Sequence, residues 1–334
     1  MKSVYVPNYY PAFRCIASAC RHSCCVGWEI DVDDDALARF DRVEGALGDR
    51  LRAGIDREAD PPCFILSEGE RCPFLNQSGL CDLITELGEE SLCHICADHP
   101  RFRNVLYDRV ELGLGLCCEA AAALILGQTE PLTVILLPEA EAARERTAHT
   151  PADKPDPVTD ALLDARETLL TILRDRTRPL SDRIRHLLTT VDIDLSMILP
   201  ESYTPVAALL RDMERLDPAW DACLDALAAL PEAPADELTR EDLPPWKSLA
   251  GEHLVGYFLY RYMTAEDDER FDLVAVRLLL AILSAALILA IHRATGGTDF
   301  ASLCEVARMY SSEIEYSEEN LERLTDEIED ILLN

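Results

Sequence analysis

Cysteine is the residue type in this sequence whose number and spacing could do chemistry. The chain has 334 residues and 13 cysteines, and most of the cysteines lie in the first 118 residues. Thiolates are soft ligands that suit zinc or an iron–sulfur cluster, and either centre takes about four of them. The pattern therefore predicts a metal-binding region, and its spacing is Cys15-x4-Cys20-x3-Cys24-Cys25, Cys72-x8-Cys81, Cys93-x2-Cys96 and Cys117-Cys118.

The expected compartment favours metal ligation over disulfide bonds. Residues 1–13 contain no basic segment followed by an apolar run, so the sequence predicts no signal peptide and a cytoplasmic location. Disulfides are rare in a reducing compartment, where clustered cysteines are more often metal ligands.

The spacing favours an iron–sulfur cluster, with zinc as the alternative. Zinc sites often carry paired C-x2-C turns, and this chain has one such pair, Cys93 and Cys96. A radical S-adenosylmethionine loop, C-x3-C-x2-C, is not expected, because its third position is Gly27. Adjacent cysteines such as Cys24 and Cys25 do not both serve one ion comfortably, so one of them serves a second site or packs in the interior. Three histidines could replace a thiolate, although a hydrogen-bonded imidazole is their commoner role: His22, His94 and His99.

The elements that must position these residues differ between the two halves of the chain. Residues 1–137 are rich in turn-forming residues, with helical pieces after Asp33 and around residues 119–126 and one strand run within 105–116. Residues 138–159 contain several prolines and are expected to form a linker. Residues 160–334 show apolar side chains at three- and four-residue spacing, which predicts an all-helical domain. The expected fold class is therefore mainly α, with a cysteine-rich metal domain followed by a helical domain.

Two segments of the helical half have specific expectations. Residues 273–293 are the most apolar, but Arg277 interrupts them, and a buried central helix is expected rather than a membrane span. Near the C-terminus, Ile314, Leu321 and Ile328 recur among many acidic residues, which predicts an amphipathic closing helix with a solvated acidic face.

Charge excludes several classes of partner. The chain has 62 acidic and 31 basic residues, for a net charge of −31. Such a surface repels phosphate backbones and anionic lipid, so neither nucleic acid nor a membrane is an expected partner. No glycine-rich phosphate loop, nucleophile elbow or H-E-x-x-H motif is present. The residues alone thus indicate a metal-binding region joined to an acidic helical domain.

Several blocks of sequence resemble the flagellin lysine-N-methylase family, whose cysteine-rich part is related to iron- or zinc-chelating domains with C-x3-C-C and C-P-F-L motifs. The first two blocks are Phe13-Arg14-Cys15-Ile16 and Cys20-Arg21-His22-Ser23-Cys24-Cys25-Val26-Gly27-Trp28. The resemblance continues through Cys72-Pro73-Phe74-Leu75-Asn76, Gly79-Leu80-Cys81 and Leu116-Cys117-Cys118-Glu119-Ala120. Weaker blocks lie at residues 252–262 and 310–321. Together they extend over nearly the whole chain.

The resemblance also implies a ligand set. Cys118 stands where the family usually has proline, and Tyr316 stands where histidine is expected. Cys63 and Cys93 fall outside the family motif and are expected to pack as spare thiols. Carried over residue by residue, the implied metal ligands are Cys15, Cys20, Cys24, Cys25, Cys72, Cys81, Cys96 and Cys117.

The function that the resemblance implies is methyl transfer from S-adenosylmethionine to lysine ε-amines of flagellin, by a protein carrying an iron–sulfur cluster of the 4Fe-4S type. A lysine ammonium must lose its proton and its hydration before it can attack, which an acidic or phenolic pocket could assist. The base is not identified. The candidates in the resembling blocks, for which packing or capping is the commoner role, are Glu252, His253, Tyr257, Tyr310, Glu315 and Tyr316.

An alternative from a different functional class stays open. The sequence has no strand followed by a glycine-rich turn and a distal acid, so a doubly wound methyltransferase fold is not expected. A non-enzymatic iron–sulfur or zinc protein, acting in metal handling or redox sensing, would carry the same cysteines without binding a methyl donor.

Overall fold

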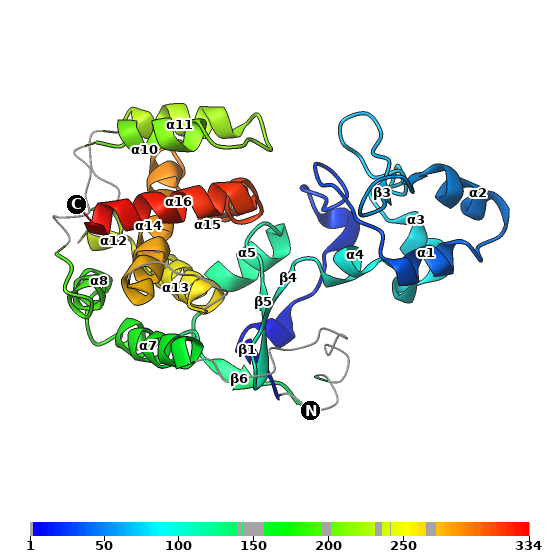
Figure 1. Ribbon diagram of the computed structural model, residues 1–334. Helices are drawn as coiled ribbons and strands as arrows, with labels where there is room; N and C mark the ends of the chain where they lie inside the picture. Colours follow the sequence, from blue (N-terminus) through cyan, green and yellow to red (C-terminus); the bar gives the residue numbers. More distant parts are fainter. Residues whose placement is uncertain are drawn as a thin grey trace. The chain divides into compact units, whose positions relative to one another are not determined.

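The computed structural model describes residues 3–138, 142, 157–194, 202–230, 236–240, 242–264 and 272–333, and these fall into two compact units (Figure 1). The helical unit comprises Met1–Phe13, Arg103–Cys117 and Ala121–Asn334. The cysteine-rich unit comprises Arg14–Phe102 and Cys118–Ala120. Most of the expected linker at 138–159 lies outside the described residues.

A small sheet joins the beginning of the chain to the helical unit. Its strand order is β4-β5-β1-β6, with β1 parallel to β5 and antiparallel to β6. The strands are β1 (Ser3–Pro7), β4 (Arg101–Val105), β5 (Arg109–Leu114) and β6 (Val134–Leu136).

This sheet corrects two expectations from the sequence. Strands β1 and β6 were not predicted, because each is short and is stabilised by pairing with residues distant in the sequence. The single domain expected at 1–137 is divided. Strands β1 and β6, at the two ends of that segment, pair with each other and belong to the helical unit. For example, the Tyr260 hydroxyl donates to the carbonyl oxygen of Leu112, at 3.0 Å, in β5.

Helices dominate the structure, which confirms the mainly α fold class. The long helices occur where apolar residues recur at helical spacing, and they bury that face. The helices of the helical unit are α5 (Glu119–Leu126), α7 (Pro157–Arg174), α8 (Leu180–Thr189), α10 (Thr204–Arg211), α11 (Trp220–Ala228), α12 (Asp236–Thr239), α13 (Pro245–Tyr262), α14 (Leu273–Ala294), α15 (Phe300–Tyr310) and α16 (Glu318–Leu333).

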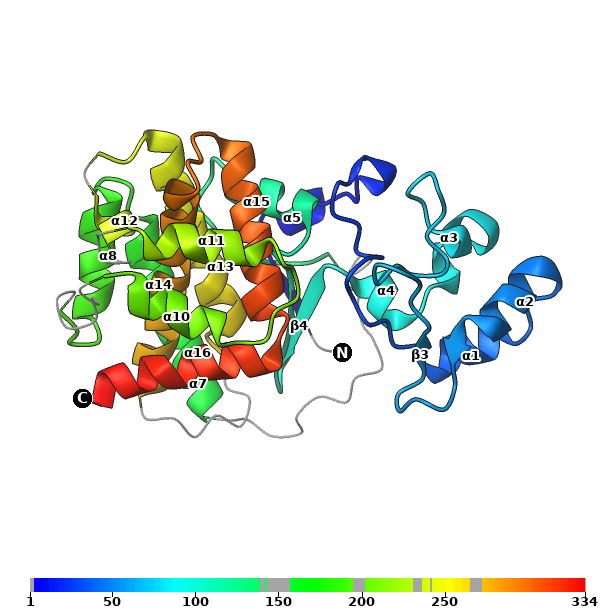
Figure 2. The ribbon, with the colours of Figure 1, turned by 90° about the horizontal axis from the view of Figure 1, so that it is seen from above.

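Helix α14 lies at the centre of the helical unit, packed against α11, α12, α13, α15 and α16 (Figures 1 and 2). Among the described residues, α14 is the single helix that is long and apolar enough to cross a membrane. In this structure, 83% of its most apolar stretch is buried. Its neighbours supply the apolar surroundings, as expected of a core helix. The acidic C-terminal helix α16 buries Leu324 and Ile328 and exposes much of its acidic side, as predicted.

The cysteine-rich unit is built from short elements around its own apolar core. The segment after Asp33 was predicted to be helical, and it forms two helices, the second of which begins at Gly45 with a left-handed φ of 74°. Phe64 packs against Phe40 and Phe74, with ring centroids 6.2 and 5.0 Å apart. The elements are α1 (Asp34–Phe40), α2 (Gly45–Ala53), β2 (Ile55–Asp56), β3 (Cys63–Phe64), α3 (Asp82–Leu87) and α4 (His94–Asp98), with 3₁₀ turns at Ala17–Ala19 and Glu89–Ser91; a further 3₁₀ turn at Tyr10–Ala12 belongs to the helical unit.

Candidate functional site

Five thiols gather in the core of the cysteine-rich unit, and we call them the core thiol group: Cys25, Cys72, Cys81, Cys93 and Cys96. Cys72 and Cys93 are buried in the apolar core, and the other three pack against it. The backbone N–H of Cys72 donates to the carbonyl oxygen of Cys25 at 2.8 Å, which joins two segments far apart in the sequence. The thiols of Cys93 and Cys96 are hydrogen-bonded to each other at the start of α4. The group thus draws its sulfurs from separate segments of the chain.

The electrostatics of the core thiol group suit a bound cation. Burial, and after it the charges of Cys25, Cys81 and Cys93, raise the pKa of Cys72 to about 12. A hydrogen bond from Cys24 lowers the pKa of Cys25 to about 7, against the effect of burial. Thiolates at these positions repel one another, and a metal ion removes that repulsion by binding the deprotonated sulfurs. The donor set therefore fits a thiophilic metal centre.

Four more thiols gather where residues 15–24 meet residues 118–120, and we call them the outer thiol group: Cys15, Cys20, Cys24 and Cys118. Among the causes that raise the pKa of Cys24 are the charges of Cys15 and Cys118, after its hydrogen bond to Cys25 and burial. The charge of Cys118 acts in the same direction on the pKa of Cys20, after burial and the charge of Glu119. Cys24 thus lies near Cys15 and Cys118, Cys20 lies near Cys118, and Cys15 and Cys24 are exposed.

An ion pair holds the two segments of the outer thiol group together. The Arg21 backbone N–H and its Nε each donate to a Glu119 carboxylate oxygen at 2.9 Å. The Cys20 Sγ lies 3.7 Å from Glu119 Oε2. Glu119 follows Cys118 directly, so these contacts fix Cys118 beside Cys20.

The structure distributes the eight ligands implied by the resemblance over three places. It brings Cys25, Cys72, Cys81 and Cys96 into the core thiol group, and Cys15, Cys20 and Cys24 into the outer thiol group. Cys117 lies in the helical unit, where its sulfur accepts a hydrogen bond from the Tyr316 hydroxyl. The ligand set itself stays a prediction.

Sequence reasoning left out Cys93 and Cys118, which the structure places within the thiol groups. The sequence did contain a signal for each, since Cys93 begins the C-x2-C pair and Cys118 is adjacent to an expected ligand. Cys63 lies in β3, and none of the contacts that define the two groups involves it. Among all 13 cysteines, every thiol is free of a disulfide.

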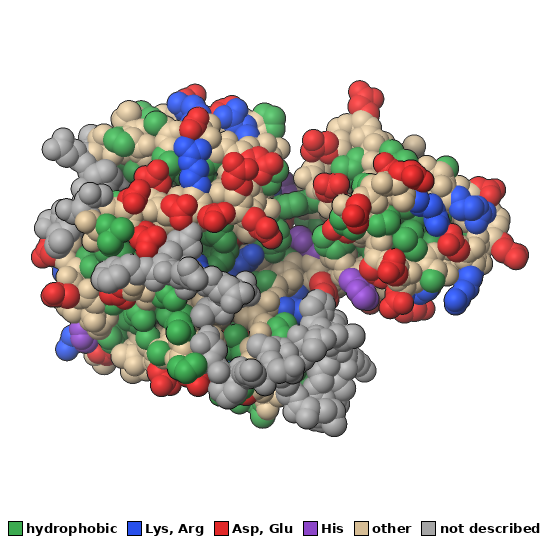
Figure 3. Space-filling model, in the orientation of Figure 1, with side chains coloured by type: hydrophobic (Ala, Val, Ile, Leu, Met, Phe, Trp, Pro, Cys, Tyr) green, Lys and Arg blue, Asp and Glu red, His purple; other side chains and the backbone are tan. Residues whose placement is uncertain are grey.

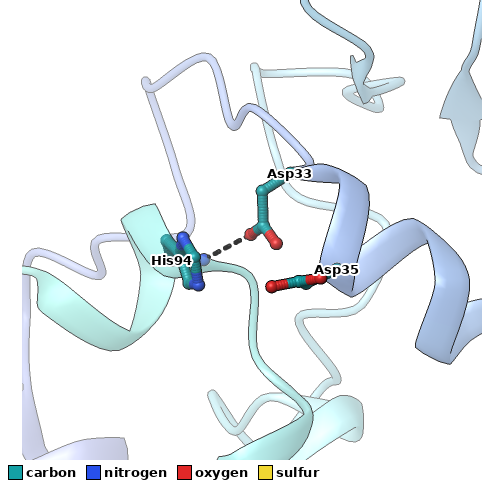
Figure 4. A group of neighbouring side chains, drawn as sticks. All are labelled: Asp33, Asp35 and His94. Atoms are coloured by element: carbon teal, nitrogen blue, oxygen red, sulfur yellow. Dashed lines mark hydrogen bonds between the residues drawn. The ribbon is translucent and has the colours of Figure 1, made fainter. Parts of the chain in front are cut away.

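The histidines near the cysteines have contacts of their own. Asp33, Asp35 and His94 place potential ligand atoms within 4.8 Å of one another (Figure 4). Both oxygens of Asp33 are already used, because Oδ1 caps α1 at the Ala36 N–H and Oδ2 accepts the His94 backbone N–H at 2.7 Å. Burial lowers the pKa of His99 to about 4, so it is neutral at physiological pH. The Asp33 cluster is therefore explained as a helix cap.

A buried polar network in the helical unit joins α13 to a π-helical turn at Ser311–Glu315, and it consists of Tyr257, Arg261, Tyr262, Glu315 and Tyr316. The hydroxyls of Tyr257 and Tyr262 each donate to Glu315 Oε1 at 2.9 Å. Arg261 lies 3.4 Å from the same carboxylate, and its guanidinium sits 5.1 Å from the Tyr316 ring centroid. Such π-helical turns are frequent at functional sites because they reorient side chains.

Burial determines the charges in the buried polar network. It raises the pKa of Tyr257, Tyr262 and Tyr316 well above 10, so these phenols stay protonated and act as hydrogen-bond donors. Glu315 accepts the hydrogen bonds of Tyr257 and Tyr262, whereas the Tyr316 hydroxyl donates to Cys117. Nearby, the Tyr9 hydroxyl is buried without a hydrogen-bond partner among the described residues. Burial raises the pKa of Tyr9, and the charge of Arg261 acts in the opposite direction. The network is therefore rich in donors around one carboxylate.

The remaining candidates from the resembling blocks have structural contacts. Glu252 is held by Arg176 and Arg183, each with a contact of 2.7 Å. The His253 ring Nε2 lies 2.9 Å from the Gln128 carbonyl oxygen. The Tyr310 hydroxyl donates to Ser284 Oγ at 2.9 Å.

Comparison with known proteins relates the chain to one family. The lysine-N-methylase of Salmonella choleraesuis (strain SC-B67) is 28% identical over 149 residues, and the match covers 40% of this chain and 35% of that protein. The lysine-N-methylase of Salmonella typhimurium (strain LT2) is 27% identical over the same shares of the two chains. The chain is related to the flagellin lysine-N-methylase family. The flagellar biosynthetic protein FliU of Salmonella muenchen agrees, at 26% identity over 149 residues and 84% of its length.

The similarity to the lysine-N-methylases covers only part of each chain. The match spans about a third of the length of the two lysine-N-methylases. No family model matches the chain, and no solved structure matches it. The matches to the two lysine-N-methylases and to FliU confirm the resemblance drawn from the motifs at the level of the family.

Proposed function

We propose that this protein transfers methyl groups from S-adenosylmethionine to lysine ε-amines of a protein substrate, with flagellin as the first candidate. The observation that carries this proposal is the match to proteins named lysine-N-methylase and to a flagellar biosynthetic protein. The charge of the chain supports it, since a net charge of −31 attracts a lysine-bearing surface. Acidic side chains spread over the visible face of the molecule in Figure 3.

The proposal includes a cysteine-ligated iron–sulfur cluster in the cysteine-rich unit. Among the described residues, one group of three ligand atoms lies within 4.8 Å of one another, and that group contains no cysteine. Zinc–sulfur bonds of about 2.3 Å in a tetrahedron would bring the sulfurs to about 4 Å from one another. An iron–sulfur cluster accepts wider spacing, because each thiolate binds a different iron. When bound, the cluster would supply a redox-capable centre to the unit.

We further propose the buried polar network as the place where the substrate amine is received. A lysine ammonium must lose its water and a proton to become a nucleophile, and the lone pair of its neutral nitrogen then attacks the methyl carbon of the sulfonium donor in line. The carboxylate of Glu315 can accept the proton, and the protonated phenols of Tyr257 and Tyr262 can stabilise the charge that this transfer redistributes. The methyl group leaves sulfur with no electrons, and S-adenosylhomocysteine departs with the bonding pair.

The test is a methylation assay with anaerobically purified protein, S-adenosylmethionine and purified flagellin, read by mass spectrometry of lysine peptides. We expect added masses of one methyl group on lysine. Glu315→Gln should lower kcat by about 100-fold or more, the usual loss when a general base is removed. Tyr310→Phe is the matched control, because Tyr310 bonds Ser284 outside the network. Equal activity of Glu315→Gln and Tyr310→Phe would contradict the role of Glu315.

The non-enzymatic alternative gives a different result in the same sample. A metal-handling or redox-sensing protein would bind no S-adenosylmethionine, and calorimetric titration of the donor measures this directly. Saturable binding of S-adenosylmethionine without methylation of flagellin would support a methyltransferase whose substrate is a different lysine-bearing protein.

A further inference from the structure

We propose that the guanidinium of Arg261 occupies the place of the substrate ammonium in the buried polar network, and that an alkylammonium group binds there once Arg261 has moved out. We call the surroundings of this guanidinium the cation cage: Tyr257, Tyr262, Glu315 and Tyr316. The inference rests on the proposed role of the network as the place where the lysine amine is received. It adds the class of ligand that the cage takes and the side chain of this protein that must leave first.

The cation cage surrounds the Arg261 guanidinium with aromatic rings and oxygen atoms. The guanidinium carbon lies 5.3 Å from the ring centroid of Tyr262 and 5.1 Å from that of Tyr316. Its Nη1 donates to the Tyr257 hydroxyl at 2.7 Å and lies 3.4 Å from Glu315 Oε1. Aromatic rings within about 6 Å attract a cation, and cages of such rings also bind methylated ammonium groups. The cage therefore fits a lysine ammonium and its methylated forms.

The charges in the cation cage balance with one cation. Glu315 is the carboxylate of the cage, and its other members are tyrosines, which are neutral at physiological pH. With Arg261 in place the two charges cancel. A second cation beside Arg261 would be a like charge in surroundings of low dielectric, where repulsion is strong. A charged lysine side chain can therefore enter only if the guanidinium leaves.

The exposure of the cage members gives the guanidinium a way out. The Arg261 side chain keeps 11% of its surface exposed, whereas the Glu315 side chain is fully buried. Tyr262 and Tyr316 are also partly exposed, so the guanidinium lies on the solvent side of the carboxylate. The backbone at Arg261 is fixed, because its carbonyl oxygen accepts a hydrogen bond from the Asn104 side chain at 3.1 Å. Rotation of the long arginine side chain, without movement of α13, is therefore sufficient to open the cage.

Arginine is suited to this place because its side chain does not react. A guanidinium stays protonated in proteins, so at neutral pH it has no free electron pair to offer a methyl donor. A lysine at the same place could lose its proton to the neighbouring carboxylate and would itself become methylated. The resident guanidinium thus keeps the cage filled until a substrate lysine displaces it, and it is not consumed.

The first experiment measures the binding of butylammonium, which has the length and charge of a lysine side chain, by calorimetry on the full-length protein. In Arg261→Ala the affinity should rise by about 10-fold or more, because the wild type binds only in the fraction of molecules whose cage is open. Adding Glu315→Gln to Arg261→Ala should remove this gain. The matched control is Arg308→Ala in α15, since the Arg308 side chain is 10% exposed and pairs with Glu305 at 2.7 Å, outside the cage. Equal affinities of Arg261→Ala and the wild type would overturn the proposal.

The second experiment uses Arg261→Lys, which places an amine of the protein itself in the cage. With S-adenosylmethionine, this amine should give its proton to Glu315 and attack the methyl carbon. The N–C bond forms as the C–S bond breaks, and the sulfur keeps the bonding pair. Mass spectrometry should then show a methyl group at position 261, whereas the control Arg308→Lys should stay unmethylated at position 308. The natural lysines serve as internal references: Lys2, Lys154 and Lys247.

The two experiments separate this proposal from the proposed function. Flagellin incubated with the wild-type protein reports methyl transfer independently of position 261. Methylated flagellin without a methyl group at position 261 of Arg261→Lys would overturn the assignment of the cage as the acceptor site. If flagellin stays unmethylated but Arg261→Ala binds butylammonium more tightly than the wild type, the cage stands and flagellin as the substrate does not. Should Arg261→Ala fail to fold, Arg261→Lys, which keeps a cation beside Glu315, decides the proposal by itself.

Discussion

The thiol of Cys24 is hydrogen-bonded to the sulfur of Cys25, although the two side chains belong to different groups of cysteines. Cys25 joins the thiols packed against the apolar core, and Cys24 joins the exposed thiols near Cys118. The two residues lie in a turn in which the Val26 N–H donates to the Ser23 carbonyl oxygen at 3.1 Å, so their sulfurs stay in contact while their other neighbours differ.

The close approach of Gly115 and Tyr316 gives a prediction on stability. A Cβ built on Gly115 would lie 2.2 Å from the Tyr316 hydroxyl oxygen and 3.0 Å from Cζ. Gly115→Ala should therefore lower the free energy of unfolding by about 1–3 kcal/mol, the usual cost of overpacking. The measurement is urea unfolding followed by tryptophan fluorescence.

A second variant isolates this contact. Tyr316→Phe removes the oxygen, so Gly115→Ala should cost less in the Tyr316→Phe background than in the wild type. Strictly additive effects of the two substitutions would show that the hydroxyl is not the atom that resists the added methyl group.

The ion pair of Glu111 and Arg166 is buried and bidentate, with N–O distances of 2.6 and 2.7 Å. Glu111→Gln leaves the Arg166 charge in the interior without its counter-charge. Loss of one partner of such a pair costs about 3–5 kcal/mol. Chemical denaturation should show this loss.

The paired replacement Glu111→Leu with Arg166→Met is the matched comparison, since it removes both charges. It should be more stable than Glu111→Gln, because apolar replacements of buried ion pairs are often close to neutral. A double variant that is less stable than the single one would mean that Arg166 contributes chiefly through its contact with the Tyr260 ring, 5.1 Å away.

The contacts of Glu252 predict an acid-sensitive component of stability. Burial favours the neutral acid, but hydrogen bonds from Arg176 and Arg183 outweigh it and lower the pKa of Glu252 below its ordinary value of 4.5. A lowered pKa means that the unfolded chain binds the proton more tightly. The contribution of Glu252 is thus complete above pH 4.5 and is lost as the pH falls through the folded-state pKa.

The measurement compares the free energy of unfolding at neutral pH and at about pH 4 in the wild type and in Glu252→Gln. The difference between the two proteins should shrink on acidification. Burial lowers the pKa of His253 and the charge of Glu252 raises it, so both proteins carry His253→Gln to remove this second titration from the comparison. Glu319→Gln, at an exposed site on α16, serves as the control and should differ little from the wild type at either pH. A difference for Glu252→Gln that does not change with pH would contradict the ion-pair explanation.

The acidic surface predicts that recognition of a lysine-rich substrate weakens with salt. The net charge of −31 attracts lysine side chains, and salt screens this attraction. The screening length is about 10 Å at 0.1 M and about 3 Å at 1 M ionic strength. The KM for flagellin should rise with potassium chloride while kcat changes little. A peptide whose lysines are flanked by glutamates is the control, and equal salt dependence for both substrates would argue against electrostatic attraction.

Local features of the sequence determined much of the helical half. The apolar spacing of residues 157–174 and 245–262 predicts helices α7 and α13, because a helix displays residues three and four apart on one face. The most apolar stretch became the central helix α14, since the unit can bury that surface only at its centre. The motifs around Cys20 and Cys72 also sufficed to indicate the family.

Only the tertiary structure decided how the cysteines are grouped and which sheet the first residues join. Cys118 lies beside Cys20 through the Arg21–Glu119 ion pair, while Cys117 turns to Tyr316, and spacing along the chain contains neither fact. Strand β1 is too short to be recognised alone and becomes a strand by pairing with β5 and β6. These features depend on contacts between residues about fifty to two hundred positions apart, whereas sequence periodicity reports only on neighbours within one element.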